Sequence, residues 1–134
     1  MRMLIDIDVP DLQKGIDFYC SAFDLHLQRI LDSDVAELVG GSSTIYLLKK
    51  DEGSECAKSI PGGRQYSRHW TPVHVDFVVD NLNLAVKRVI DAGAIRETEC
   101  VAWRRSKCIT FSDPFGHGFC LIEFENETYS DEIA

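Results

Sequence analysis

The sequence predicts an α+β fold made of two tandem βαβββ modules. Two observations predict this fold. First, residues 4–25 and 74–95 align without a gap, so that Asp6 falls on Asp76 and apolar positions fall on apolar positions. Second, each segment has the pattern of a strand followed by a helix, and further strand-like segments follow each helix. We interpret the repeat as an internal duplication, and equivalent strand positions of the two halves should line a cleft between them.

The first module comprises residues 1–50. Residues 3–9 alternate between apolar and polar side chains, which is the period of a strand with one covered face. Pro10 and Asp11 follow and are typical of a helix start. The helix then carries an apolar stripe, which should cover the apolar face of the strand. Three shorter strands are predicted near residues 26–31, 34–39 and 43–48.

The second module comprises residues 73–126 and repeats this order. Residues 51–72 are polar and contain glycine and proline, which indicates a long connection between the modules. A strand is predicted over residues 73–79, and Asn81 can cap a helix that Gly93 ends. Strands near residues 95–103, 106–112 and 118–125 complete the module, and residues 127–134 form an acidic tail.

The composition narrows the classes of function. The 134 residues carry a formal net charge of −8, and no basic stripe is present to bind a nucleic-acid backbone. No apolar run approaches the roughly 20 residues of a membrane-spanning helix, and the N-terminus carries acids where a secretory signal needs an apolar segment. The five cysteines lack zinc-finger spacing and indicate reduced thiols. We therefore expect a cytoplasmic protein that binds neither nucleic acid nor membranes.

The chain resembles the vicinal oxygen chelate superfamily, which includes glyoxalase I, extradiol dioxygenases, fosfomycin-modifying enzymes and bleomycin-resistance proteins. The resemblance rests on the repeat and on three segments, IDVPDLQKGIDFYCSAFDL, HVDFVVDNL and SDPFGHGFCLIEF. It implies that each module curls its sheet into a half-shell, so that a pair of modules encloses a pocket as a curved-sheet cleft. It also implies four positions for metal ligands, which in this sequence are Leu4, Tyr46, His74 and Cys120.

Of these four positions, only His74 carries a typical metal ligand. Leu4 cannot coordinate a metal, Tyr46 is a rare ligand, and Cys120 stands where the superfamily usually has a glutamate. We therefore expect no metal ion and no other cofactor. The alternative is a divalent metal ion that His74 helps to hold.

Asp6, His74 and Asp76 are predicted to face away from the helices, and they are the candidate catalytic residues. Carboxylates that share a concave surface with a histidine can raise one another's pKa and supply a general base. The same set can bind a cationic group, or hold a metal ion outside the superfamily positions. The structural alternative is that the carboxylates pair with arginine or backbone partners.

The candidate ligand-binding residues also include aromatic side chains. Trp70 and Trp103 can each form a stacking wall of a pocket, and packing in the core or an interface is the alternative. His69 lies in a segment of aromatic and basic residues that resembles a ligand gate or a dimer contact. Cys120 is predicted to line the pocket as a small hydrophobe, because nearby acids make a thiol unreactive. The full set is Asp6, Tyr46, His69, Trp70, His74, Asp76, Trp103 and Cys120.

Three classes of function remain open. The leading hypothesis is a metal-free protein that holds a small amphipathic molecule in the cleft between the modules. The alternatives are a metal-dependent lyase, isomerase or dioxygenase that uses His74, and a metal-free enzyme with Asp6, Asp76 or His74 as general base. We also expect a homodimer, because two half-shells expose sheet edges and apolar surface that one small chain does not cover.

Overall fold

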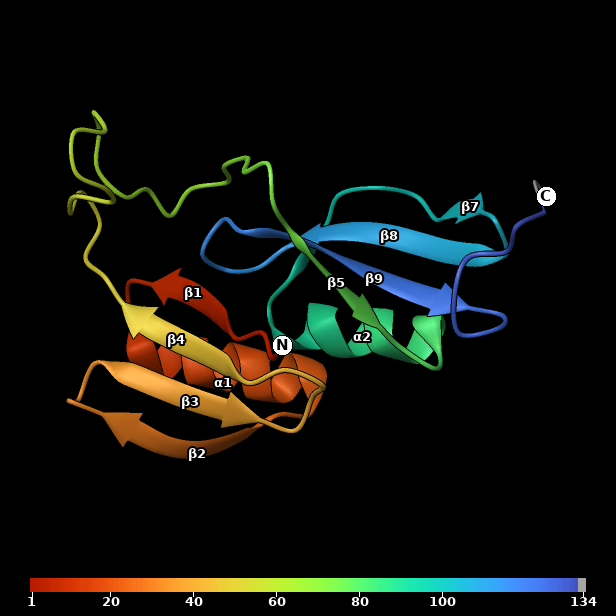
Figure 1. The fold of residues 1–134 in the computed structure, drawn as a ribbon, viewed down its shortest axis with the longest axis horizontal. Helices are drawn as coiled ribbons and strands as arrows, with labels where there is room; N and C mark the ends of the chain where they lie inside the picture. The colour runs from red at the N-terminus through yellow and green to blue at the C-terminus, as the bar shows by residue number, and fades with distance from the viewer. Residues whose placement is uncertain (133–134) are drawn as a thin grey trace. The chain divides into compact units, whose positions relative to one another are not determined.

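The computed structural model describes residues 1–132 and divides into two compact units, Met1–Ser67 and Arg68–Ala134. Each unit contains one helix and one sheet, and in each the chain runs from a strand into the helix and then into further strands (Figure 1). The predicted α+β fold of two repeated modules is therefore confirmed. The predicted cleft between the modules stays a prediction, and each unit is described by itself.

The first unit contains four strands in the order β1-β4-β3-β2, with β1 parallel to β4 and the other neighbours antiparallel. Its elements are β1 (Ile5–Val9), α1 (Leu12–Phe23), β2 (His26–Leu31), β3 (Val35–Val39) and β4 (Ile45–Lys49). The Asp11 carboxylate caps α1 by accepting a hydrogen bond from the Lys14 N–H at 3.0 Å. The sequence therefore placed this helix start correctly.

Helix α1 packs closely on its sheet because a glycine faces the strands. A Cβ atom at Gly15 would lie 3.1–3.2 Å from the side chains of Leu47 and Val9, both of which are fully buried. Ile16 and Tyr19 of the same helix are also buried. This packing assigns one face of the sheet to the core, and the alternate residues of each strand must then lie on the other, open face.

The second unit repeats the arrangement, with strands in the order β5-β9-β8-β6 and with β7 paired to β8. Its elements are β5 (Val75–Val78), α2 (Leu82–Ala92), β6 (Ile95–Arg96), β7 (Val101–Trp103), β8 (Ser106–Ser112) and β9 (Gly118–Phe124). Strand β5 is parallel to β9, as β1 is to β4. The two sheets therefore have matching topology at the positions of the sequence repeat.

The single strand predicted over residues 95–103 is wrong, because the chain forms two short strands there. Between them, the Thr98 hydroxyl accepts a hydrogen bond from the Thr110 N–H at 3.0 Å, and Arg96 Nε donates to the Thr98 carbonyl at 2.9 Å. The Glu97 N–H still donates to the Thr110 carbonyl at 2.9 Å, but the Thr110 N–H bonds a side chain in place of a backbone carbonyl, and the strand is interrupted there.

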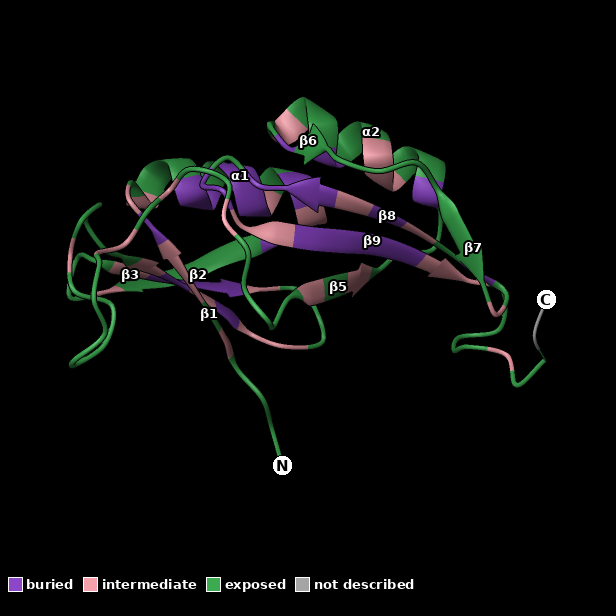
Figure 2. Cartoon of the chain, turned by 90° about the horizontal axis from the view of Figure 1, so that it is seen from above, coloured by how far each residue is buried: buried purple, intermediate pink, exposed green. Residues whose placement is uncertain are grey.

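Helix α2 packs against β9, and side chains cap its first turn. Asn81 accepts from the Leu84 N–H at 3.1 Å, and the Glu123 carboxylate accepts from the Leu82 N–H at 2.9 Å. Gly93 ends the helix with a φ of 123°, which an L side chain rarely adopts. Within this unit, buried residues run along β8 and β9, whereas α2 is largely exposed on its outer side (Figure 2). Neither helix among the described residues has the length and apolar character needed to span a bilayer.

Candidate functional site

Four polar side chains form a row across the open face of the first sheet. Register pairs place Asp6 beside Tyr46, Tyr46 beside Glu37, and Glu37 beside Arg29. Arg29 Nε donates to Glu37 Oε1 at 2.9 Å, and the Tyr46 hydroxyl donates to Glu37 Oε2 at 2.7 Å. Glu37 is only 5% exposed, so this carboxylate is a buried acceptor with two donors.

The bonds of this row set the protonation of two of its members. The hydrogen bonds from Arg29 and then from Tyr46 lower the pKa of Glu37, whereas the hydrogen bond to Glu37 is the largest cause that raises the pKa of Tyr46. The Tyr46 hydroxyl therefore stays protonated and directed at Glu37. Sequence reasoning missed Glu37, although the residue is the only charged one in strand β3 and its parity places it on the open face.

The second sheet brings three predicted site residues together on its open face. His74 Nε2 lies 3.0 Å from Asp76 Oδ1, and Cys120 is the register partner of Asp76 on the neighbouring strand β9. One donor atom from each of these three residues lies within 4.8 Å of the other two. The His74 and Asp76 side chains are 54% and 40% exposed, whereas Cys120 is buried. A small molecule or ion can therefore reach the pair, with the thiol at the base.

A cavity of about 180 Å³ adjoins this group. It is lined by Arg68, Trp70, Thr71, His74, Thr110, Gly118, Phe119 and Cys120. The Arg68 guanidinium is neutralised by Glu97, with Nη2 donating to Oε1 at 3.0 Å. The cavity thus combines the exposed indole of Trp70, the ion-paired guanidinium of Arg68 and the His74–Asp76 pair.

A second cavity of about 360 Å³ lies farther along the same strands. It is lined by Thr98, Val101, Trp103, Ser106, Cys108, Thr110, Ile122 and Tyr129. Cys108 and Thr110 alternate along β8 and therefore share one face, and Thr110 lines both cavities. The structure thus separates Trp103 from Trp70: Trp103 belongs to the second cavity, and its ring centroid lies 4.9 Å from that of Tyr129.

The Cys108 thiol, which lines the second cavity, has little nucleophilic character. Burial, reinforced by the neighbouring Cys120 thiol and the Asp76 carboxylate, raises the pKa of Cys108 to about 12. The Cys120 sulfur lies 3.3 Å from the Thr110 hydroxyl oxygen. Cys108 is therefore a protonated, packed side chain at neutral pH.

His69 does not line either cavity but pairs with another histidine. His69 Nε2 lies 3.0 Å from His117 Nδ1, and the His69 N–H donates to the Gly116 carbonyl at 3.2 Å. Asp113 holds the turn that carries His117 by accepting from the N–H groups of Phe115 and His117. The partnership joins residues 48 positions apart in the chain, so local sequence patterns gave no signal for it.

The predicted site residues therefore fall into separate places. Asp6 and Tyr46 lie in the first unit, and the other six lie in the second. The second unit groups Trp70 with the His74–Asp76 pair and Cys120, as its geometry shows.

Comparison with known proteins agrees with this fold. A family model described as a glyoxalase-like domain matches residues 4–122. A hypothetical protein from S. aureus superimposes with a TM-score of 0.70 at 19% identity, over 92% of this chain and 93% of that one. The fosfomycin resistance protein FosX from Mesorhizobium loti gives 0.67 at 17% identity, over 94% and 93% of the two chains. Lactoylglutathione lyase from Agrobacterium tumefaciens gives 0.65 at 18% identity, over 97% and 98%. At these identities the structures show a shared fold, and no curated protein matches the sequence.

Proposed function

The chain belongs to the glyoxalase-like domain family of the vicinal oxygen chelate superfamily, and from this premise we propose that it binds a small molecule on the open face of its second sheet. The observation that carries the proposal is the exposed His74–Asp76 pair beside a cavity that Trp70 also lines. Binding pockets typically combine a few converging polar groups with aromatic walls. This cavity has both features.

The polar groups of the cavity favour a ligand with hydrogen-bond donors. When His74 donates Nε2–H to Asp76, its Nδ1 and the second carboxylate oxygen are left as acceptors. The only cationic lining residue, Arg68, is already paired with Glu97. An ammonium or amide head group therefore complements the site, and the net charge of −8 favours the approach of a cation. The Trp70 ring offers the adjoining stacking surface.

We propose that this binding needs no metal ion. The superfamily positions fall on Leu4, Tyr46, His74 and Cys120, and their side chains do not form a ligand set. Leu4 has no donor atom, and the Tyr46 hydroxyl is bonded to the Glu37 carboxylate at 2.7 Å. Half of the superfamily positions thus contribute no available ligand atom.

The second candidate is a metal-dependent lyase, isomerase or dioxygenase, and the His74, Asp76 and Cys120 donors favour it. Their imidazole nitrogen, carboxylate oxygen and thiol sulfur match the ligands of zinc, and catalytic zinc sites use three protein ligands. Zinc held by these residues would supply a Lewis acid. Asp76 is outside the superfamily positions, so this would be a rearranged site.

Binding of benzylamine, with benzyl alcohol as the uncharged analogue, tests the leading proposal. In NMR titrations, benzylamine is expected to shift the resonances of His74, Asp76 and Cys120, and Asp76→Asn should weaken its binding by about tenfold. Leu84→Ala, on the exposed side of α2, is the matched control. Equal affinity for the amine and the alcohol would contradict the proposed acceptor site.

Metal analysis separates the two candidates. Protein purified without added metal and dialysed should contain far less than one equivalent of zinc, nickel, manganese or iron, and benzylamine should bind unchanged after chelation. Stoichiometric metal that survives dialysis in the wild type and is lost in His74→Ala would favour the metal-dependent enzyme instead.

A further inference from the structure

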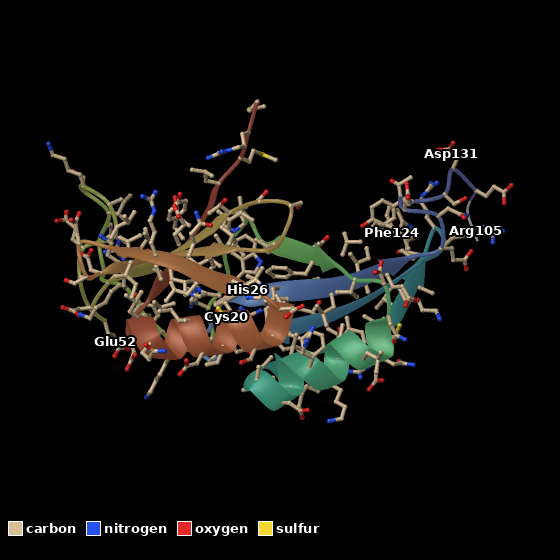
Figure 3. All side chains as sticks on the ribbon, turned by 90° about the horizontal axis from the view of Figure 1, so that it is seen from below. Cys20, His26, Glu52, Arg105, Phe124 and Asp131 are labelled. Atoms are coloured by element: carbon tan, nitrogen blue, oxygen red, sulfur yellow. The ribbon has the colours of Figure 1, made fainter. Side chains whose placement is uncertain are left out.

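The chain continues past β9 into a segment that folds back onto the β7–β8 hairpin. We call residues 125–132 the C-terminal strap. The Glu125 N–H donates to the Arg105 carbonyl at 3.1 Å, and the Ser130 N–H donates to the Arg104 carbonyl at 2.9 Å. Arg104 Nη1 donates in return to the carbonyls of Ser130 and Asp131, each at 3.1 Å. Figure 3 shows Arg105, Phe124 and Asp131 gathered at this end of the unit.

The strap carries an aromatic ring to the second cavity. The ring centroid of Tyr129 lies 4.9 Å from that of Trp103 and 4.9 Å from that of Phe124, and both contacts are edge-to-face. Tyr129 also lines the 360 Å³ cavity. The strap follows the segment that the family model matches, which ends at residue 122.

The second cavity is chemically unlike the first. None of its eight lining side chains carries a charge, and its walls include Val101, Trp103, Ile122 and Tyr129. Val101 and Trp103 are 57% and 54% exposed, so the cavity leaves apolar surface in contact with water. Covering such surface is favourable, and the exposed rings suit a flat apolar group.

We propose that the strap and the second cavity form an apolar subsite that takes the distal aromatic body of a ligand whose donor head group binds at the His74–Asp76 pair. This inference rests on the proposed function and names its ligand class, an elongated aromatic amine. Thr110 lines both cavities and so marks their junction on the sheet. The first cavity, beside the His74–Asp76 pair, is called the polar cavity, and it selects the head group. The apolar subsite selects the length and flatness of the aromatic body.

The ion pairs that help to hold the strap are exposed, which lowers the cost of opening it to admit the body. Arg105 pairs with Glu125 at 3.2 Å and with Glu132 at 3.5 Å, and all three side chains are at least 43% exposed. Exposed ion pairs contribute little to stability, and segments with few buried contacts open locally at low cost. A bound aromatic ring would replace water against Tyr129 and Trp103 and thereby hold the strap closed.

The test compares benzylamine with 4-phenylbenzylamine, which adds a second ring, and with 4-phenylbenzyl alcohol, which lacks the ammonium group. Calorimetry on the full chain measures the affinity gained from the second ring. In the wild type this gain is expected to be about tenfold or more. In Tyr129→Ala the second ring should raise the affinity by less than about twofold, while benzylamine binds as tightly as it does to the wild type. Tyr129→Phe keeps the ring and should keep the gain.

The outcomes separate this inference from the proposed function. A second ring that adds no affinity in the wild type, or a gain that survives Tyr129→Ala, would overturn the subsite. Asp76→Asn should weaken both amines equally and leave 4-phenylbenzyl alcohol unaffected. If Asp76→Asn changes neither amine while Tyr129→Ala still abolishes the gain, the head-group site is wrong and the subsite stands. Far-UV circular dichroism checks that each variant is folded, with Leu84→Ala as an exposed apolar control.

Discussion

The guanidinium group of Arg68 lies directly over the backbone of Gly118, where β9 begins. A Cβ atom at Gly118 would lie 2.7 Å from Arg68 Nη2 and 3.1 Å from the carbon at the centre of the guanidinium. The absence of a side chain thus lets Arg68 cross the strand, reach the Gly116 carbonyl at 3.3 Å and pair with Glu97. Both residues line the polar cavity, so this contact fixes one of its walls.

Gly118→Ala should therefore displace Arg68 and alter the polar cavity. The obstructed group is the end of a flexible side chain, so we expect a loss of only about 1 kcal/mol in the free energy of unfolding. Benzylamine binding should weaken more than this stability change alone explains. Urea unfolding and calorimetry measure the two effects. Gly41→Ala is the matched control, because its nearest neighbours lie 3.8 Å away. Unchanged benzylamine binding in Gly118→Ala would contradict this role of Arg68.

The buried carboxylate of Glu37 should make the stability of the protein depend on pH in acid. Its pKa is lower in the folded chain than in the unfolded chain, first because of the Arg29 hydrogen bond. Such a group adds stability that is present above the unfolded pKa, about 4.3, and is lost as the pH falls through the lower folded value. Glu37→Gln should reduce the fall in melting temperature that the wild type shows between about pH 5 and 3. Substitution of the exposed Glu52 by Gln should leave that fall unchanged. If the melting temperatures of the wild type and of Glu37→Gln depended on pH in the same way, this role of Glu37 would be refuted.

The cysteines should differ in reactivity according to their surroundings. Exposed Cys56 and Cys100 are expected to react with iodoacetamide at pH 8, because water reaches both thiols. Cys108 should stay unmodified in the folded protein, since its pKa of about 12 keeps the thiol protonated. Peptide mass spectrometry measures the extent at each site, and labelling in urea shows that every cysteine can react. Rapid modification of Cys108 in the folded state would show that this thiol is ionised.

The homodimer expected from the sequence is tested by mass in solution. Trp70 and Val73 are 81% and 80% exposed, and Val78 on the edge strand β5 is 64% exposed. Exposed apolar residues near an unpaired strand edge favour self-association. Light scattering at micromolar concentration should give about twice the chain mass of 15.1 kDa. A mass that stays at the single-chain value up to about 100 µM would contradict the prediction.

Local patterns were sufficient to predict most elements of the fold. The caps at Asp11 and Asn81 and the helix end at Gly93 all depend on residues within a few positions of one another. The break between β6 and β7 could not be predicted in this way. It depends on a hydrogen bond from the Thr110 N–H to the Thr98 hydroxyl, and only the folded sheet brings these residues together.

The candidate site was predictable only where strand parity decides it. Asp76 and Cys120 are register partners, and the alternation of their strands placed both on the open face. The contact of His69 with His117 links a loop to a turn 48 residues away, and no sequence period encodes it. The position of Tyr129 beside Trp103 likewise depends on backbone bonds from the strap to a hairpin.

The bonded row of the first sheet has a consequence for how the duplicated halves can diverge. In the register of the repeat, Cys120 takes the place of Tyr46 and Thr110 that of Glu37. One copy has used its open-face polar residues for its own rigidity, whereas the other has kept small side chains there. Selection can therefore act on the two copies under different pressures. Under the proposed function, changes on the open face of the first sheet act mainly on stability, and changes on that of the second act on ligand binding.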